Sequence, residues 1–198
     1  LLSSGQAFQC PCSRKDLEQT GGRHRRPCQP AQPDLEKAWR FDSESCHITF
    51  DDRLQGRQNE QLIDVSGDFV LKRRDHVFAY QLAVVVDDAN LGVTDIVRGI
   101  DLMHATPRQV ALQQALGLDT PNYYHLPVLC HADGEKLSKG SGAPAVSGDP
   151  SQNLRRVLHH LGLQAPHGLN TPAELLEWGQ AHWHIDALTE QSRIEWTA

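Results

Sequence analysis

Apolar and polar positions form clear patterns in the second part of this 198-residue chain, beginning after residue 62. The stretch "DFVLKRRD" at 68–75 predicts a strand that runs into a charged turn, and "GVTDIVRG" at 92–99 predicts a short strand bounded by glycines. Between them, "VFAYQLAVVVDD" at 77–88 is continuously apolar, so its periodicity allows either a strand or a buried helix. Asp87 and Asp88 fit the polar end of this buried segment better than a metal site, because adjacent side chains point in different directions.

Helices are predicted further along the chain. Thr106-Pro107 opens a helix with proline at its first position, and Gly117 ends it. The run "YYHLPVL" at 123–129 predicts another strand. From Asp149-Pro150 onward the pattern is helical, and "TPAELLEWGQA" at 171–181 begins with a Thr-x-x-Glu capping box. This alternation of short strands and helices predicts an α/β fold followed by a helical appendage.

The first 62 residues are less regular. Residues 1–30 predict a short strand, a cysteine-rich turn and one small helix, with a capping-box start at Ser13 and Asp16 and an end at Gly21-Gly22. Residues 29–62 are polar, and the alternating run "CHITF" at 46–50 is their clearest feature. We interpret this region as an insertion or the wall of a subdomain.

Composition restricts the possible partners. A net charge of −6 and a pI near 6.0 exclude a generally basic nucleic-acid binder, so any such contact must come from local patches. No apolar run approaches the roughly 20 residues that cross a bilayer, and no signal peptide is recognisable, so we expect a cytoplasmic protein without a membrane partner. The five cysteines are then expected to be reduced thiols. Because the first residue is Leu1 and not Met, we expect the chain to begin partway into a longer one.

Four potential metal ligands are concentrated near the N terminus. Cys10 and Cys12 are separated by one residue, His24 follows after eleven more, and Cys28 after another three. Tetrahedral zinc needs four soft or borderline ligands, which this spacing supplies, so it favours zinc over buried thiols beside an exposed histidine. Three arginines in the same loop would steady thiolate charge, face a phosphate backbone, or simply be solvated: Arg23, Arg25 and Arg26.

An arginine follows the predicted strand at 92–99. Arg98 stands beside Gly99, where its guanidinium could emerge at the edge of a sheet and bind a carboxylate through two hydrogen bonds. Pairing with a neighbouring acid, Asp95 or Asp101, is the simpler interpretation.

A lysine-containing turn lies in "CHADGEKLSKGSGAP" at 130–144. Lys136 and Lys139 are followed there by glycines and other small residues. Such a loop can carry its ammonium groups onto a phosphate when a substrate is present. A surface lysine pair without a function would have the same composition, so this stretch alone does not decide between the two.

Taken in order, four segments resemble the second half of the catalytic core of class I glutamyl-type tRNA synthetases: "FAYQLAVVVDD", "GVTDIVRGIDL", "YYHLPVL" and "GEKLSKGSGAPA". "KLSKG" stands in the place of the KMSKS loop of that class. The cysteine cluster and the short tail make the chain similar to the short members of this class that attach glutamate to queuosine in the anticodon of tRNA(Asp). The resemblance runs from about residue 8 to residue 165.

The resemblance implies a fold and a domain organisation. The fold would be the second half of a Rossmann-type catalytic core, in the α/β class, with a zinc-bearing insertion and a C-terminal helical stem. The insertion or acceptor-type subdomain would occupy residues 1–62, the nucleotide-binding core with its KLSKG loop 63–145, and the stem-like tail 146–198. The HIGH loop of the first half is not recognisable, so we expect a fragment or an N-terminal part outside this sequence. Only 59 residues follow Lys139, too few for a large anticodon-binding region.

The resemblance also implies an activity and the residues of the substrate site. A monomeric enzyme would activate L-glutamate with ATP and Mg²⁺ and transfer it to queuosine of tRNA(Asp). Tyr80 and Arg98 would bind glutamate. Lys139 would contact the ATP phosphates as a catalytic residue, with Lys136 in support. The alternatives are a truncated glutamyl-tRNA synthetase and a non-catalytic zinc-bearing RNA-binding fragment.

The resemblance bears on the metal ligands as well. Cys10, Cys12 and Cys28 match zinc ligands of the family. His24 stands where the family commonly has a tyrosine, and because histidine is the better zinc donor we expect the structural site to survive this change.

Overall fold

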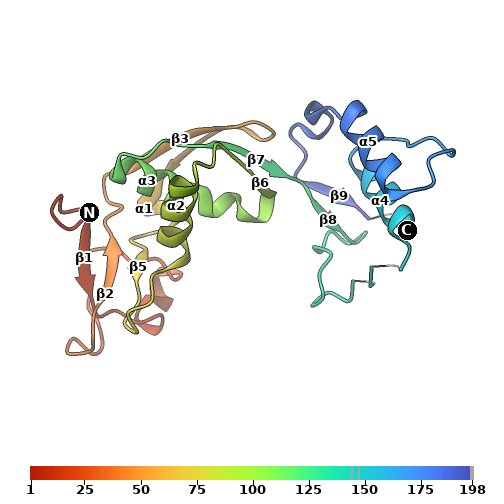
Figure 1. The fold of residues 1–198 in the computed structure, drawn as a ribbon. Helices are drawn as coiled ribbons and strands as arrows, with labels where there is room; N and C mark the ends of the chain where they lie inside the picture. The colour runs from red at the N-terminus through yellow and green to blue at the C-terminus, as the bar shows by residue number, and fades with distance from the viewer. Residues whose placement is uncertain (144, 147, 197–198) are drawn as a thin grey trace. The chain divides into compact units, whose positions relative to one another are not determined.

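The computed structural model describes residues 1–143, 145–146 and 148–196, which form two compact units along the chain drawn in Figure 1. Unit 1 consists of Leu1–Asp52, Arg57–Ile96 and Leu102–Tyr123, and unit 2 of Arg53–Gly56, Val97–Asp101 and Tyr124–Ala198. Two strands, β6 (Asp95–Gly99) and β7 (Asn122–Leu126), begin in unit 1 and end in unit 2. Each unit is therefore assembled from segments that are distant in the sequence.

A three-stranded antiparallel sheet carries the N-terminal part of unit 1. Its order is β1-β2-β5, formed by Ala7–Cys10, Ala38–Phe41 and Val70–Lys72. The 3-10 helix η1 (Lys15–Thr20) lies between β1 and β2. The Ser13 N–H donates to Asp16 Oδ2 at 2.6 Å, and the Asp16 N–H donates to Ser13 Oγ at 3.3 Å, which confirms the predicted start of this helix.

A second sheet has the strand order β4-β3-β7-β6. Residues 29–62, in which the sequence indicated one alternating run, supply β3 (His47–Asp52) and β4 (Gly56–Gln61) in addition to β2. β3 and β7 are parallel. This region also contributes to the apolar core of unit 1, whose most deeply buried members are Phe41, Ile48, Leu62, Val110, Leu112 and Tyr123.

Helices cover this sheet in unit 1. They are α1 (Leu62–Val65), α2 (Tyr80–Leu91) and α3 (Thr106–Leu116), with the 3-10 helix η2 (Ile100–Ala105) leading into α3. The apolar run at 77–88 thus lies in a helix from Tyr80 onward and is not a strand, whereas the predicted helix after Thr106-Pro107 is confirmed. α2 packs beside α3, and α3 packs against β3 (Figure 1).

Unit 2 contains a two-stranded sheet and a helical pair. β8 (Val128–Cys130) is parallel to β9 (Arg193–Glu195), and Cys130 lies opposite Glu195. Between these strands the chain forms α4 (Pro150–His160), α5 (Pro172–His182) and η3 (Ile185–Leu188). The predicted capping box of Thr171 and Glu174 is present, and α4 packs against α5. Among the described residues, no helix is both long and apolar enough to cross a membrane.

Candidate metal centre and substrate-binding residues

The four predicted metal ligands meet in unit 1. Cys10 ends β1, Cys12 follows it, and His24 and Cys28 lie in the connection between η1 and β2. Their ligand atoms all lie within 4.8 Å of one another. His24 Nε2 is 3.1 Å from Cys10 Sγ, which is 3.6 Å from Cys28 Sγ. Donor atoms around a tetrahedral zinc ion are about 3.5–3.8 Å apart, so this set, in which Cys28 is half-buried and the other three are buried, fits a closed four-ligand metal site.

A buried aspartate orients the histidine of this cluster. His24 Nδ1 lies 2.9 Å from Asp68 Oδ2, and both side chains are enclosed. With Nδ1–H donating to the carboxylate, Nε2 presents its lone pair to the cysteines, as metal-binding histidines do. The Asp68 N–H donates to the His24 carbonyl at 2.7 Å, so backbone and side chain of the same residue hold His24. Sequence reasoning missed Asp68, because it lies 44 residues from His24 and no local pattern connects them.

The three thiols differ in their tendency to ionise. Burial opposes ionisation of Cys10, but hydrogen bonds from the Cys12 N–H and the surrounding side chains outweigh it and lower the pKa of the Cys10 thiol to about 7. Burial and the neighbouring thiols raise the pKa of Cys12 to about 12. Burial also raises the pKa of Cys28. Because metal ligation requires thiolates, a metal entering this cluster must displace protons from Cys12 and Cys28.

The arginines of the same loop are paired within unit 1. Arg25 Nη2 lies 2.5 Å from Asp64 Oδ1, and Arg23 donates to the Asp64 carbonyl at 2.7 Å. Arg26 forms an ion pair with Asp42. Each cation thus has an acceptor within unit 1, a structural role that the three interpretations of the sequence did not include.

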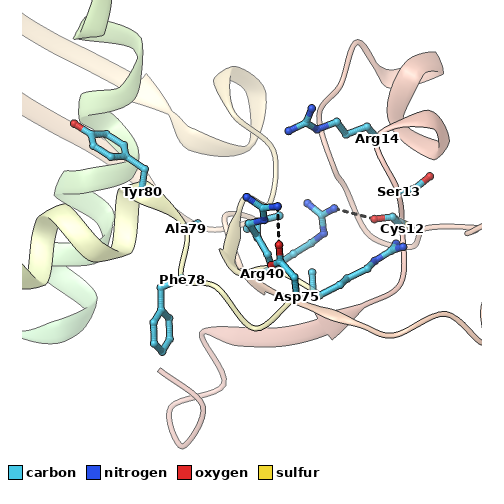
Figure 2. A pocket seen from close by; sticks show the side chains of 12 residues that line it. Cys12, Ser13, Arg14, Arg40, Asp75, Phe78, Ala79 and Tyr80 are labelled. Atoms are coloured by element: carbon cyan, nitrogen blue, oxygen red, sulfur yellow. Dashed lines mark hydrogen bonds and ion pairs between the residues drawn. The ribbon is translucent and has the colours of Figure 1, made fainter.

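Tyr80, a predicted glutamate-binding residue, begins α2 and is exposed. It lines a cleft in unit 1 with a volume of about 740 Å³. Figure 2 shows Tyr80 and Phe78 on one side of this cleft and Arg14 and Cys12 on the other. Four arginines and one acid line it, namely Arg14, Arg40, Arg73, Arg74 and Asp75; we call this pocket the arginine cleft.

Arg98, the other predicted glutamate-binding residue, belongs to unit 2. Its Nε–H donates to Nε2 of His125 at 3.0 Å. His125 is fully buried, and because its Nε2 accepts this hydrogen bond the ring is neutral with its proton on Nδ1. The bond fixes the plane of the guanidinium. Sequence reasoning missed this partner, since His125 sits inside a stretch that was recognised only as a strand.

The lysine loop is folded back onto β8. The Leu137 N–H donates to the Leu129 carbonyl at 2.8 Å, and Gly134 takes a φ of 85° in the intervening turn. Lys136 Nζ lies 2.6 Å from Asp101 Oδ2. Lys136 therefore has a fixed position at the base of the loop.

Lys139 differs from Lys136 in its surroundings. It is exposed, and within residues 1–143, 145–146 and 148–196 its ammonium group has no hydrogen bond or ion pair. Ser141 shapes the backbone around it, because its hydroxyl donates to the Lys136 carbonyl at 2.7 Å and accepts from the Ser138 N–H at 2.9 Å. Pro144, at the end of the predicted loop, lies outside the described residues.

The structure thus brings all four predicted metal ligands together. The predicted substrate-binding residues are divided between the two units. Tyr80 belongs to unit 1, with the metal cluster, whereas Arg98 and the two lysines belong to unit 2. Three candidate residues are each oriented by one partner: His24 by Asp68, Lys136 by Asp101, and Arg98 by His125.

Comparison with known proteins gives one family. Residues 32–177 match the family model described as tRNA synthetases class I (E and Q), catalytic domain. The chain is 48% identical over 187 residues to the glutamyl-Q tRNA(Asp) synthetase of Ectopseudomonas mendocina, covering 92% of the chain and 64% of that protein. It is 44% identical over 201 residues to the protein of the same name from Methylococcus capsulatus, covering 98% of the chain and 67% of that protein. The chain thus spans about two thirds of the length of these curated relatives.

A solved structure has the same fold. The crystal structure of the glutamate-tRNA synthetase from Elizabethkingia anophelis matches with a TM-score of 0.61 and 18% identity, over 93% of this chain and 39% of that protein. At this identity the likeness concerns the fold, and it confirms the predicted α/β arrangement of a class I synthetase catalytic domain.

Proposed function

Because the chain belongs to the catalytic-domain family of class I glutamyl- and glutaminyl-type tRNA synthetases, we propose that it is part of an enzyme that activates glutamate with ATP and transfers it to queuosine of tRNA(Asp). One observation carries this proposal: identity of 44–48% over more than nine tenths of the chain to relatives that are named for that activity. ATP with Mg²⁺, L-glutamate and tRNA(Asp) are the proposed substrates, and a monomer is the proposed state.

In the first step, an oxygen of the glutamate α-carboxylate attacks the α-phosphorus of ATP. The bond to pyrophosphate breaks, and glutamyl adenylate forms. Negative charge increases on the departing phosphates, and the Lys139 ammonium stabilises it. The exposed position of Lys139 supports this role, because its charge is not engaged by another described residue and can reach a triphosphate. Lys136, held by Asp101, supports the base of the loop.

Arg98 and Tyr80 hold the amino acid in the proposed enzyme. A guanidinium recognises a carboxylate best when its plane is fixed, and His125 fixes the plane of Arg98 through its Nε–H. In the second step a hydroxyl of the queuosine cyclopentene diol attacks the activated carbonyl carbon. The ester forms, AMP leaves with the electron pair of the broken acyl–phosphate bond, and the hydroxyl proton is released to solvent.

We further propose that the Cys₃His cluster binds zinc in a structural role. Four protein ligands complete a tetrahedral shell and leave no open position for a substrate or water. The ion would join the loop after β1 to the connection before β2. Its removal should loosen residues 8–30 and leave the catalytic lysines untouched.

The lysine loop supplies the first test of this proposal. In the protein purified at its full natural length, Lys139→Ala should slow ATP–pyrophosphate exchange at least about a hundredfold, because a preorganised charge contact to the transition state is lost. The affinity for glutamate should stay close to that of the wild type, whereas Arg98→Ala should lose glutamate affinity first. Lys15→Ala removes an exposed lysine of unit 1 and is the matched control. An exchange rate for Lys139→Ala within a fewfold of the control would contradict the proposed role of the loop.

The acceptor is tested with radiolabelled glutamate and three RNAs. Label should enter tRNA(Asp) that contains queuosine, and should not enter tRNA(Asp) without queuosine or tRNA(Glu). Labelling of tRNA(Glu) at its 3′ end would instead identify an ordinary glutamyl-tRNA synthetase. Exchange without any labelled RNA would contradict the transfer step.

A further inference from the structure

The arginine cleft has a local excess of positive charge in a chain whose net charge is −6. Four of its lining residues are arginines, and Asp75 is its one carboxylate. A zinc-bound Cys₃His set would add a single negative charge beside Cys12. Even with both negative charges subtracted, about two positive charges remain in the cleft.

Arg40 contributes a buried cation with incomplete hydrogen bonding. It is 5% exposed, and its Nη atoms donate to the carbonyls of Asp68 and Cys12 at 3.1 and 3.2 Å. In the described part of the chain its buried Nε has no hydrogen-bond partner. Carbonyl groups do not neutralise a guanidinium, and a buried N–H without an acceptor is costly. An anion in the cleft would provide the missing counter-charge.

The other arginines differ in how firmly they are held. Arg73 forms an ion pair of 2.7 Å with Asp75, and Arg74 donates to the Pro11 carbonyl. Arg14 is exposed, and no other described residue forms a hydrogen bond or ion pair with its guanidinium. Arg14 is therefore the arginine that can bind a ligand without first giving up a contact within the protein.

Two exposed aromatic rings complete the cleft. Phe78 is 60% and Tyr80 59% exposed, and they lie on the side away from Arg14 (Figure 2). Guanidinium groups bind phosphates through paired hydrogen bonds, and exposed aromatic rings stack on nucleobases that have left a helix. Their combination on one concave surface is typical of sites that bind single-stranded nucleic acid.

We propose that the arginine cleft binds a phosphodiester of a single-stranded RNA loop, with Arg14 on the phosphate and Phe78 stacked on a neighbouring base. The inference rests on the proposed function, in which the acceptor nucleotide lies in a tRNA anticodon loop. A free nucleotide such as ATP is the competing occupant, and the experiment below distinguishes it from RNA. The bound loop would present its backbone beside Tyr80.

Direct RNA binding tests this site without ATP or glutamate. The probe is a fluorescently labelled RNA hairpin with a single-stranded loop, titrated with the zinc-loaded protein at salt concentrations from about 50 to 200 mM. Arg14→Gln should weaken binding about tenfold and lower the slope of log K against log salt by about one, as expected for one lost phosphate contact. Phe78→Ala should weaken binding about tenfold and leave the slope unchanged, because stacking releases no counterions.

The controls separate this proposal from its alternatives. Arg57→Gln removes an exposed arginine of unit 1 that does not line the cleft, and it should bind the hairpin as the wild type does. Three results would overturn the proposal. They are equal affinity for a blunt duplex of the same stem, displacement of the hairpin by ATP, and wild-type binding by both Arg14→Gln and Phe78→Ala. Unaltered zinc content and thermal unfolding of the two variants exclude misfolding.

Glutamate activation and RNA binding at the cleft are tested by separate measurements. ATP–pyrophosphate exchange by the unaltered protein measures activation of glutamate and does not depend on RNA binding at this cleft. If exchange occurs and no RNA hairpin binds, the cleft proposal fails while glutamate activation stands. If the hairpin binds with the expected response to Arg14→Gln and Phe78→Ala and exchange is absent, the cleft proposal stands and the proposed activation fails.

Discussion

Replacing the carboxylate behind the metal cluster should weaken zinc binding by an amount that the structure allows us to work out. Asp68 accepts two hydrogen bonds, from His24 Nδ1 at 2.9 Å and from the Ser43 N–H at 2.9 Å. An asparagine offers one acceptor oxygen and one donor group, so Asp68→Asn can keep only one of these bonds. It also removes the charge that raises the basicity of the His24 ligand atom.

The expected loss is about 10–100-fold in zinc affinity, or about 1.4–2.8 kcal/mol, as for other residues that orient a metal-binding histidine. Folding without zinc should lose about 1–3 kcal/mol as well, because a buried donor is left without an acceptor. Competition with a chromophoric chelator measures the zinc affinity. Urea unfolding in EDTA measures the stability of the zinc-free protein.

A matched variant decides whether the reasoning holds. Asp42→Asn removes the ion-pair partner of Arg26, and in the described part of the chain the Asp42 side chain has no hydrogen bond or ion pair with His24 or the three cysteine ligands. Its zinc affinity should stay within about twofold of the wild type. Equal losses in Asp68→Asn and Asp42→Asn would refute a specific role for the Asp68–His24 hydrogen bond, and so would an unchanged affinity in Asp68→Asn.

Three further outcomes are expected. Gly67→Ala should lower the free energy of unfolding in urea by at least about 2 kcal/mol, because its Cβ would lie 2.5 Å from the His24 carbonyl oxygen at a φ of 63°. Gly92→Ala, at a φ of 68° in open space, should lower it less, and equal losses in the two variants would contradict the clash. Zinc affinity should rise between about pH 6 and pH 8, because burial raises the pKa values of the Cys12 and Cys28 thiols and binding must release their protons; an affinity independent of pH in calibrated chelator buffers would contradict this. Asp149→Ala should cost about 1 kcal/mol in thermal or urea unfolding, because its side chain caps α4, and an unchanged unfolding midpoint would contradict a stabilising cap.

Elements with strong local signals could be predicted from the sequence. Thr106-Pro107 and Gly117 fix the ends of α3 through backbone conformations that do not depend on distant contacts. The apolar run that became α2 could not be assigned, because a segment without polar interruptions has no period. β4, with the sequence "GRQNEQ", was missed because an edge strand in a polar setting needs no apolar alternation, and its pairing with β3 alone defines it.

The same distinction applies to the candidate sites. The metal ligands could be predicted, because C-x-C and H-x3-C are local spacings. The partners that orient the candidate residues could not: Arg98 and His125 are 27 residues apart, and the fold alone brings them into contact. The arginine cleft was invisible for a related reason, since Arg14, Arg40 and Arg73 come from three separate segments and only a folded chain reveals their shared surface.

The pairing of β8 with β9 has a consequence for how this part of the chain can vary between homologues. The two strands lie side by side. The chain therefore leaves the sheet after β8 and returns to it at β9, with α4 and α5 in between. The helices of this excursion pack on each other. Insertions, deletions or an exchanged helical module would be accommodated there at a small entropic cost, with the foundation of the lysine loop unchanged. The tail can thus change in length and surface while the lysine loop keeps its geometry.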